Sequence, residues 1–478
     1  MDRGTREAER LIEEARSTGA TTLSLNFLKL ASVPDTLSQL THLECLRLDN
    51  NVLDHLPALD PLTNLIELSV SNNQLTGLYL TPGQQKHIKK LRLSDNQFEI
   101  LPECIGKLTN LEHLDISQNK LGSLPDWIGQ LSNLIELEAY KCNLTSLPET
   151  LGKLINLTHL DVANNGLESL PDSLGQLAGL EDLDASENRL KALPESLGML
   201  TSLRNLWLQK NVIARLPEST GGLVNLLCLW LHKNELETVP AGIGKLRHLR
   251  TLCICENELK SLPGELDSLT DLDALCMMGN QLTSMPDTLG TLTNLNALDV
   301  SYNHLESLPD TLGQLMSLTR LDASNNELER LPDTLGQLTN LTELDISDNR
   351  LENLPETLGH CANLAELSVS GNKLTGFPDT MSQLANLKEL TAYHNELESL
   401  PDWIGKLGNL THLSLHGNRL QGLPDSLGQL KNLIMLSLDN NQFKTLPDVV
   451  WQFKDIDGLS YYRNPFTDGH PFFAPQPR

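Results

Sequence analysis

The hydrophobic and polar positions of this chain follow one pattern that repeats along its length. The stretch Leu318–Asn340 reads LTRLDASNNELERLPDTLGQLTN, with apolar and polar residues alternating before an asparagine. A period of two predicts a short strand, and the proline with the leucines behind it predicts a short helical or 3-10 segment. The asparagine position returns every 23 residues from Asn73 to Asn464, except where Cys142 takes its place. A fixed period of this length predicts a solenoid of stacked repeats.

Each repeat contains more leucine than it can bury alone, so we expect neighbouring repeats to stack without an internal break. Their strands should form a parallel sheet with about 4.8 Å between neighbours, on the concave side of the stack because the helical side is bulkier. The amide of the repeated asparagine, such as Asn326, is predicted to bond to backbone groups at the turn. The pattern changes at Leu28, which takes the asparagine position, and at Leu80–His87, which replaces the Pro-x-x-Leu-Gly segment.

The repeated residues resemble those of the leucine-rich-repeat family, over about residues 20–464. The L-P-x-x-L-G-x-L half is similar to the 23-residue intracellular type found in Ras-group scaffolds and in many bacterial repeat proteins. The resemblance implies an α/β solenoid, the leucine-rich-repeat horseshoe, with a concave parallel β-sheet and short helical or 3-10 segments on the convex side. It also implies binding rather than catalysis, since most members of the family catalyse nothing.

The two ends of the chain differ from the repeats. Residues 1–19 are predicted to hold a capping helix that starts at Thr5, stops near Gly19 and covers the first repeat with one apolar face. That face is formed by Ala8, Leu11, Ile12 and Ala15. The solenoid is expected over residues 20–454, and a C-terminal cap with a Pro-rich tail over 455–478. We find no linker and no second domain.

The formal charge of −26 excludes some partners and has a structural source. The residue after the repeat proline is acidic in fifteen repeats, for example Asp126, Glu149 and Asp172. A carboxylate is favourable there because the first N–H groups of the helical turn are exposed. The negative balance argues against nucleic acid or an anionic membrane as partner.

The N-terminal segment, the apolar runs and the cysteines of the sequence predict the cellular compartment. The start MDRGTREAER has no apolar core, so we expect no signal peptide, and no apolar run is long enough for a membrane span. The eight cysteines do not cluster near the ends, where secreted leucine-rich-repeat proteins usually carry disulfide caps. These features predict a reducing, cytoplasmic location. Export of a bacterial protein without a cleaved signal is the alternative.

Catalytic motifs are missing from the sequence. There is no glycine-rich phosphate loop, no H-E-x-x-H and no G-x-S-x-G. His412 and His416 fall on one strand, where four residues span about 13 Å, so they cannot chelate one metal together. We therefore expect no enzyme activity and no cofactor.

Function must then lie in the strand residues that face away from the core. The residue type at the fifth position of the repeat changes in blocks along the chain. A small basic end, with Arg47, Lys89, Lys90 and Arg92 nearby, comes first. An acidic band, an apolar block, a second acidic band and a polar stretch accompanied by His394, His412 and His416 follow it. In order it reads Ser69, Arg92, Asp115, Glu138, Asp161, Asp184, Trp207, Trp230, Cys253, Cys276, Asp299, Asp322, Asp345, Ser368, Thr391, Ser414 and Ser437.

The apolar block is the predicted binding site. Trp207 and Trp230 should lie side by side, between the acidic bands that end at Asp184 and start at Asp299. The residues expected nearby are Cys228, Cys253, Cys255, Cys276, Met278 and Tyr302. Exposed apolar side chains of this size usually mark an interaction site, and tryptophan is enriched in such sites. The predicted partner is a protein with an apolar centre and a basic rim. Duplicated repeats that bind nothing are the alternative.

Metal binding is the other interpretation of this face. Sulfur atoms around one zinc ion lie about 3.7 Å apart. Cys253 and Cys276 are predicted neighbours across two strands, whereas Cys228 and Cys255 lie diagonally at about 7 Å. We therefore predict reduced cysteines without metal. The acidic bands lack the wrapping loop that calcium uses, so they are read as an electrostatic docking surface, with solubility as the alternative.

These observations predict a cytoplasmic, non-enzymatic scaffold or regulator that binds a protein through the concave face, and by resemblance a role in signalling. The first alternative is a bacterial effector-type protein acting on host proteins. The second is an accessory subunit of a larger assembly that makes contact through its convex face or edges.

Overall fold

The computed structural model describes residues 3–80 and 86–467. The chain forms two compact units, unit 1 (Met1–Leu249) and unit 2 (Arg250–Arg478). Most of the irregular segment Leu80–His87 and the Pro-rich tail from residue 468 lie outside the described residues. The domain boundaries proposed from the sequence therefore stay predictions.

Unit 1 starts with helix α1 (Arg3–Thr18) and continues through ten strands in its described part. The strands are β1 (Thr22–Ser24), β2 (Cys45–Arg47), β3 (Glu67–Ser69), β4 (Lys90–Arg92), β5 (His113–Asp115), β6 (Glu136–Glu138), β7 (His159–Asp161), β8 (Asp182–Asp184), β9 (Asn205–Trp207) and β10 (Cys228–Trp230). The 3-10 helices are η1 (Asp35–Gln39), η2 (Ile105–Lys107), η3 (Asp126–Gln130), η4 (Glu149–Lys153), η5 (Asp172–Gln176), η6 (Glu195–Met199), η7 (Glu218–Gly222) and η8 (Ala241–Lys245).

Unit 2 repeats the same strand and 3-10 alternation over residues 250–467. Its strands are β11 (Thr251–Cys253), β12 (Ala274–Cys276), β13 (Ala297–Asp299), β14 (Arg320–Asp322), β15 (Glu343–Asp345), β16 (Glu366–Ser368), β17 (Glu389–Thr391), β18 (His412–Ser414), β19 (Met435–Ser437) and β20 (Gly458–Ser460). Its 3-10 helices are η9 (Gly264–Ser268), η10 (Asp287–Thr291), η11 (Asp310–Gln314), η12 (Asp333–Gln337), η13 (Glu356–His360), η14 (Asp379–Gln383), η15 (Asp402–Lys406), η16 (Asp425–Gln429) and η17 (Asp448–Phe453).

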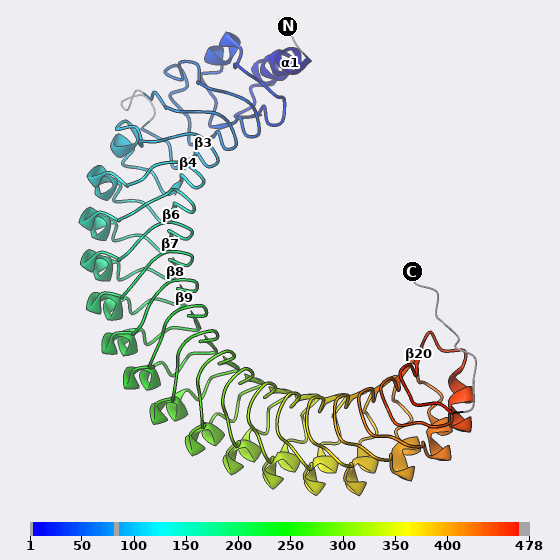
Figure 1. The fold of residues 1–478 in the computed structure, drawn as a ribbon. Helices are drawn as coiled ribbons and strands as arrows, with labels where there is room; N and C mark the ends of the chain where they lie inside the picture. The colour runs from blue at the N-terminus through cyan, green and yellow to red at the C-terminus, as the bar shows by residue number, and fades with distance from the viewer. Residues whose placement is uncertain (1–2, 81–85, 468–478) are drawn as a thin grey trace. The chain divides into compact units, whose positions relative to one another are not determined.

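All strand pairs within each unit are parallel and in repeat register. Leu321 of β14 pairs with Leu298 of β13 on one side and with Leu344 of β15 on the other, so each residue faces its equivalent in the next repeat. Within each unit the strands lie along the concave side and the 3-10 helices along the convex side (Figure 1). The predicted arrangement of strands and turns is thus confirmed inside both units.

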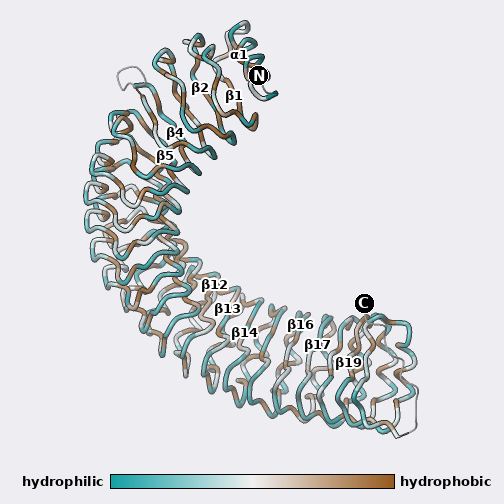
Figure 2. Tube along the Cα trace, turned by 45° about the horizontal axis from the view of Figure 1, so that its top comes forward, coloured by the Kyte–Doolittle hydropathy of each residue, from teal (hydrophilic) through white to brown (hydrophobic). Residues whose placement is uncertain are grey.

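The core lies between the strands and the 3-10 helices. The repeat leucines at 318, 321, 328, 331, 335 and 338 are all buried, with at most 7% of any of them exposed. Hydrophobic and hydrophilic residues alternate within every turn of the chain (Figure 2). Burying one leucine contributes about 1.5–3 kcal/mol, and stacking is what makes that burial complete.

The repeated asparagine holds each repeat to the ones before it. The Nδ2 group of Asn326 donates to the carbonyl oxygens of Val300, Ala323 and Ser324 at 3.0–3.2 Å, and its Oδ1 accepts from the N–H of Leu305 at 3.0 Å. One buried side chain therefore makes hydrogen bonds to four backbone groups at the turn, and it is the partner of the Leu305 N–H. Equivalent bonds recur at the other asparagine positions, for example at Asn188.

Two residues take the place of the asparagine in the described repeats. The thiol of Cys142 is fully buried and donates to the carbonyl oxygens of Ile116 and Tyr140 at 3.1 and 3.6 Å. Leu28 is half-buried, and its backbone N–H donates to Oδ1 of Asn51 at 3.1 Å. A thiol can therefore replace the donor side of the amide, but with longer and weaker bonds.

Helix α1 covers the open end of the first repeat, as predicted. Ala8, Ile12 and Ala15 are buried, and the helix packs against β1 and η1. It begins at Arg3, two residues before the predicted start, and ends before Gly19, whose φ of 66° lies in the left-handed region. No helix among the described residues is long and apolar enough to cross a membrane.

The acidic residues after the repeat prolines, except Glu103, are the first residues of 3-10 helices, as predicted. Some also bind the next repeat: Glu149 accepts the backbone N–H of Ser173 at 3.1 Å, and Glu218 accepts that of Gly242 at 3.0 Å. The penultimate residue of most of these 3-10 helices is a glycine that lies close to the next repeat. A Cβ added to Gly336 would lie 2.3 Å from the carbonyl oxygen of Thr357. The convex side is therefore bound by backbone contact as well as by leucine packing.

Replacing Asn326 with alanine should destabilise unit 2 strongly. The change removes four hydrogen bonds and leaves the N–H of Leu305 without a partner, whereas the carbonyl oxygens of Val300, Ala323 and Ser324 keep Asn303, Asn349 and Tyr302 as donors. One unsatisfied buried group costs about 1–3 kcal/mol, and each further hydrogen bond that is lost costs about 0.5–1.5 kcal/mol. We expect a loss of about 2–5 kcal/mol in the free energy of unfolding, measured by urea denaturation. Asn326→Cys should lose less, because Cys142 already works in this position. Equal losses for the two variants would contradict this account.

Candidate functional site

Trp207 and Trp230 lie side by side on the solvent face of unit 1. They end strands β9 and β10 and pair directly in register. The residues before them, Leu206 and Leu229, are fully buried. Because successive side chains of a strand point to opposite faces, the tryptophans point away from the core. Both are half-buried.

Polar groups and one thiol surround the tryptophan pair. Asp184 of β8 pairs with Trp207 in register, and the ring of His232 meets Trp230 edge-on with 6.1 Å between centroids. Cys228 is half-buried on β10, beside Asn205 of β9. The N-terminal half of the predicted site is thus assembled within unit 1 as an apolar centre with a carboxylate beside it.

The remaining predicted residues belong to unit 2 and differ in exposure. Cys253 and Cys255 are only 8% and 4% exposed, so they add little to any surface. Cys276 and Met278 are half-buried, whereas Tyr302 is 59% exposed. The assembly of all predicted residues into a single patch stays a prediction, because the tryptophans lie in unit 1 and these residues in unit 2.

The predicted reduced state of the cysteines is wrong for one pair. Cys255 and Cys276 form a disulfide across β11 and β12, with Cα atoms 5.8 Å apart, inside the usual range for such bonds. The predicted diagonal spacing of about 7 Å was too long. Cys45, Cys104, Cys142, Cys228, Cys253 and Cys361 carry thiols. A disulfide is unusual in a reducing compartment, so cysteine usage no longer supports a cytoplasmic location.

The aspartates of the two acidic bands have a structural task. Each accepts the backbone N–H of the residue two positions later at 2.9–3.0 Å, which fixes the bend after the strand; these are Asp115, Asp161, Asp184, Asp299, Asp322 and Asp345. Their stacking is electrostatically unfavourable. Burial and neighbouring carboxylates raise the pKa of Glu138, and burial raises the pKa of Asp161 against a backbone hydrogen bond.

Unit 2 contains an acidic groove that the fifth position alone does not reveal. The groove has a volume of about 160 Å³ and is lined by two columns of side chains: Arg320, Glu343, Glu366 and Glu389 in one, and Asp322, Asp345, Ser368 and Thr391 in the other. Burial and the charges of Glu389 and Glu343 raise the pKa of Glu366. The first column occupies the third position of the repeat, which also faces away from the core. Considering the third and fifth positions of the sequence together would have identified the groove.

The polar stretch of unit 2 holds an aromatic cluster that sequence reasoning missed. The rings of Tyr393 and His416 stack with centroids 4.5 Å apart, and His394 meets His416 edge-on at 5.3 Å. Burial and the neighbouring His394 lower the pKa of His416, although Asp439 opposes them. The sequence does contain a signal for this cluster, because aromatic residues occupy the seventh and eighth positions of one repeat and the seventh position of the next.

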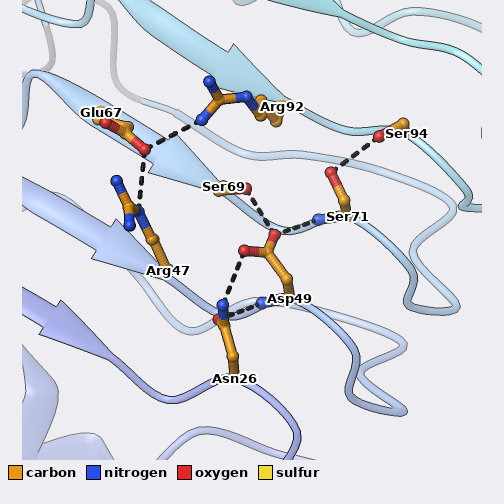
Figure 3. A network of polar contacts seen from close by, with 8 residues as sticks. All are labelled: Asn26, Arg47, Asp49, Glu67, Ser69, Ser71, Arg92 and Ser94. Atoms are coloured by element: carbon orange, nitrogen blue, oxygen red, sulfur yellow. Dashed lines mark hydrogen bonds and ion pairs between the residues drawn. The ribbon is translucent and has the colours of Figure 1, made fainter.

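The predicted basic end of unit 1 is largely neutralised. A single carboxylate oxygen of Glu67 binds Arg47 and Arg92, each at 3.0 Å (Figure 3). Lys89 pairs with Glu112 at 2.7 Å. In the same region Asp49 accepts hydrogen bonds from Ser69 and Ser71 and pairs with Asn26 (Figure 3). These bonds form a polar network at the ends of β1, β2 and β3 rather than a cationic surface.

One group among the described residues could hold a metal ion. The ligand atoms of Cys253, Cys255 and Cys276 all lie within 4.8 Å of one another. The stacked aspartates form no such group in the described part of the chain, and the histidines at 412 and 416 do not either.

Neutralising Asp322 should stabilise unit 2 at neutral pH. Burial, with the charges of Asp299 and Asp345, raises the pKa of Asp322 against hydrogen bonds from Ser324. The folded state therefore binds this proton more tightly than the unfolded state, and stability falls as pH rises through the raised pKa. Asp322→Asn keeps the acceptor for Ser324 and should gain about 0.2–1 kcal/mol at pH 7, the size of a cross-strand charge pair.

Thermal and urea unfolding from about pH 3 to pH 7 measure this effect. The gain should vanish at the acid end, where Asp322 is protonated in the wild type. Asp310→Asn, which changes an exposed acid at the start of η11, is the matched control and should give no gain. A pH-independent difference for Asp322→Asn would contradict the proposed repulsion.

Comparison with known proteins identifies the repeat. A model described as leucine-rich repeat region matches residues 195–308 and 289–398, one described as leucine rich repeats (2 copies) matches 86–129 and 408–450, and one described as leucine rich repeat matches 155–213. No curated protein matches the chain in sequence.

Several solved structures share the fold. A leucine-rich-repeat protein of Leptospira interrogans is 32% identical, with 85% of this chain and 93% of that chain covered and a TM-score of 0.67. YopM of Yersinia enterocolitica is 28% identical over 96% of this chain and 94% of that chain, with a TM-score of 0.71. The plant peptide hormone receptor RGFR1, in complex with RGF2, is 25% identical over 95% and 88%, with a TM-score of 0.61.

The predicted leucine-rich-repeat solenoid is therefore confirmed, by the asparagine ladder and strand register of both units and by a relative that shares 32% of its residues over 85% of the chain. The chain belongs to the leucine-rich-repeat family.

Proposed function

We propose that this protein is a non-enzymatic scaffold or regulator that binds a protein partner through the strand face, with Trp207 and Trp230 at the centre of the contact. Members of the leucine-rich-repeat family are in general protein-interaction modules. The observation that carries the proposal is the in-register tryptophan pair on the solvent face of β9 and β10. Two large half-exposed rings in a position where the fold requires no apolar residue are best explained by a partner.

The charge around the pair defines the partner's chemistry. Asp184 borders Trp207 in register, and Asp182 on the same strand accepts a hydrogen bond from Asn205 at 2.6 Å. Unit 2 adds the acidic groove between Arg320 and Thr391 on its own strand face. The carboxylates on the strand face of each unit favour a partner segment in which lysine or arginine flanks an apolar or aromatic residue. The same charge disfavours nucleic acids and anionic membranes.

A second candidate is a bacterial effector-type role, in which the protein acts on host proteins through the same face. Two observations favour it over a cytoplasmic signalling scaffold. The chain is similar to bacterial proteins of Leptospira and Yersinia over most of its length. The Cys255–Cys276 disulfide also fits a protein that leaves a reducing compartment. The similarity to RGFR1, a receptor in complex with RGF2, supports binding of a polypeptide in either case.

The Trp207→Ser/Trp230→Ser double variant tests the proposed contact. Selection from a displayed random-peptide library on the wild type should enrich peptides with an aromatic or aliphatic residue beside lysine or arginine. The double variant should bind those peptides at least about 30-fold more weakly, since hot-spot residues contribute 2 kcal/mol or more. Its free energy of unfolding should change by no more than about 1 kcal/mol, because both rings lie outside the core.

Trp127→Ser is the matched control. Trp127 is half-buried on the convex side of unit 1, where its ring lies over Gly106. This variant should lose stability but keep peptide binding, so the two variants separate packing from recognition. Selected peptides that bind the double variant as tightly as the wild type would refute the tryptophan site. A large loss of stability in the double variant would place the rings in the core instead.

A further inference from the structure

Three sulfur atoms converge on the strand face of unit 2. Cys253 ends β11 and pairs in register with Cys276 at the end of β12. Cys255 follows β11 by two residues, on the same side of the chain as Cys253. The sulfur atoms of these three residues lie within 4.8 Å of one another. The sequence places the cysteines on adjacent repeats, but only the structure brings all three sulfurs together.

The spacing suits a single thiophilic cation. The sulfurs of Cys253 and Cys255 are 3.6 Å apart. Zinc binds thiolates at about 2.3 Å in a tetrahedron, which separates two bound sulfurs by about 3.7 Å. Cys255 and Cys276 are joined as a disulfide, which is the oxidised form of the same pair. Reduction of that bond frees two sulfur atoms. To bind one ion together, they need to move apart only from the length of the S–S bond to about 3.7 Å.

A carboxylate stands beside the sulfur cluster with one oxygen turned toward it. Oδ1 of Asp299 accepts from the backbone N–H of Ser301 at 3.0 Å and from its hydroxyl at 2.7 Å, which fixes the carboxylate plane. Oδ2 lies 3.7 Å from the sulfur of Cys276. That distance is close to the separation of an oxygen and a sulfur bound to one zinc ion. Ser301 therefore acts as the outer-shell group that orients a ligand.

The cluster of three sulfurs is buried to the degree expected of a structural metal site. Cys253 and Cys255 are nearly enclosed, while Cys276 and Asp299 are half-buried and give the site an opening to solvent. Thiols bind zinc as thiolates, so metal binding and proton release are coupled.

We propose that the thiolates of Cys253, Cys255 and Cys276 bind one zinc ion in the reduced protein. Asp299, which lies 3.7 Å from the sulfur of Cys276 but outside the group of three sulfurs, moves toward the ion to supply the fourth ligand through Oδ2. A phosphine and one water reduce the disulfide to two thiols, with the oxygen passing to phosphorus; one Zn²⁺ then displaces three protons from the three thiols. The disulfide form lacks two thiolates and does not bind. All four residues of the site belong to unit 2.

Titration of the reduced full-length protein with Zn²⁺ alone, in competition with a chromogenic chelator, tests the site. The expected result is one zinc per chain and, with Co²⁺ in its place, a thiolate-to-cobalt charge-transfer band. Cys276→Ser should weaken zinc binding at least 100-fold and abolish the band, and Asp299→Asn should weaken it about 10-fold or more. The unreduced protein should bind at least 100-fold more weakly than the reduced one.

Cys45→Ser is the matched control, because Cys45 is a half-buried thiol of unit 1. It should bind zinc as the wild type does, which excludes thiols in general as the source of the signal. Circular dichroism verifies that each variant is folded, and Cys253→Ser replaces Cys276→Ser if the latter unfolds. Zinc uptake by the reduced wild type no stronger than by Cys276→Ser, or no charge-transfer band with Co²⁺, would overturn the proposal.

Discussion

The buried asparagine ladder is the interaction on which both units depend. Strands of three residues make too few ladder bonds to hold a repeat in place, and the turn after each strand leaves carbonyl and N–H groups pointing into the core. One amide per repeat meets four of these groups, with partners in its own repeat and in the preceding one, as at Asn326. Leucine burial supplies most of the stabilisation, but the amide decides how one repeat sits on another.

Because the leucines and the asparagine stabilise the interior, the side chains on the strand face are free to vary. The middle residue of strands β1 to β19 is buried in the core, whereas most residues on either side of it are half-buried or exposed. Tryptophan, aspartate and serine therefore occupy equivalent positions without changing the backbone, as the register of Asp184 with Trp207 shows. A scaffold with a constant interior and a variable face is suited to recognising a partner by the order of side chains along it.

The charge of the protein divides into structural and interactive parts. Glu149 and Glu218, which open 3-10 helices, accept N–H groups of the next repeat, and the strand aspartates fix the bend behind them. Each strand aspartate has a local hydrogen bond that keeps it in place, although burial and neighbouring carboxylates raise the pKa of Asp161 and Asp322. The protein tolerates this repulsion because the strand face is open to water, where a positively charged partner or dissolved counter-ions can offset it.

The sequence alone determined every feature that depends on one repeat and its equivalent 23 residues away. The strands, the core leucines, the asparagine ladder and the outward direction of Trp207 and Trp230 all follow from that period. The covering helix follows from the apolar face of its own segment. The tertiary structure decided the contacts between non-equivalent positions. Cys255 meets Cys276 at a separation of 21 residues, and Glu67 meets Arg47 and Arg92 at separations of 20 and 25. Such contacts depend on the stagger of neighbouring turns and on side-chain rotamers, which the period of the sequence does not encode.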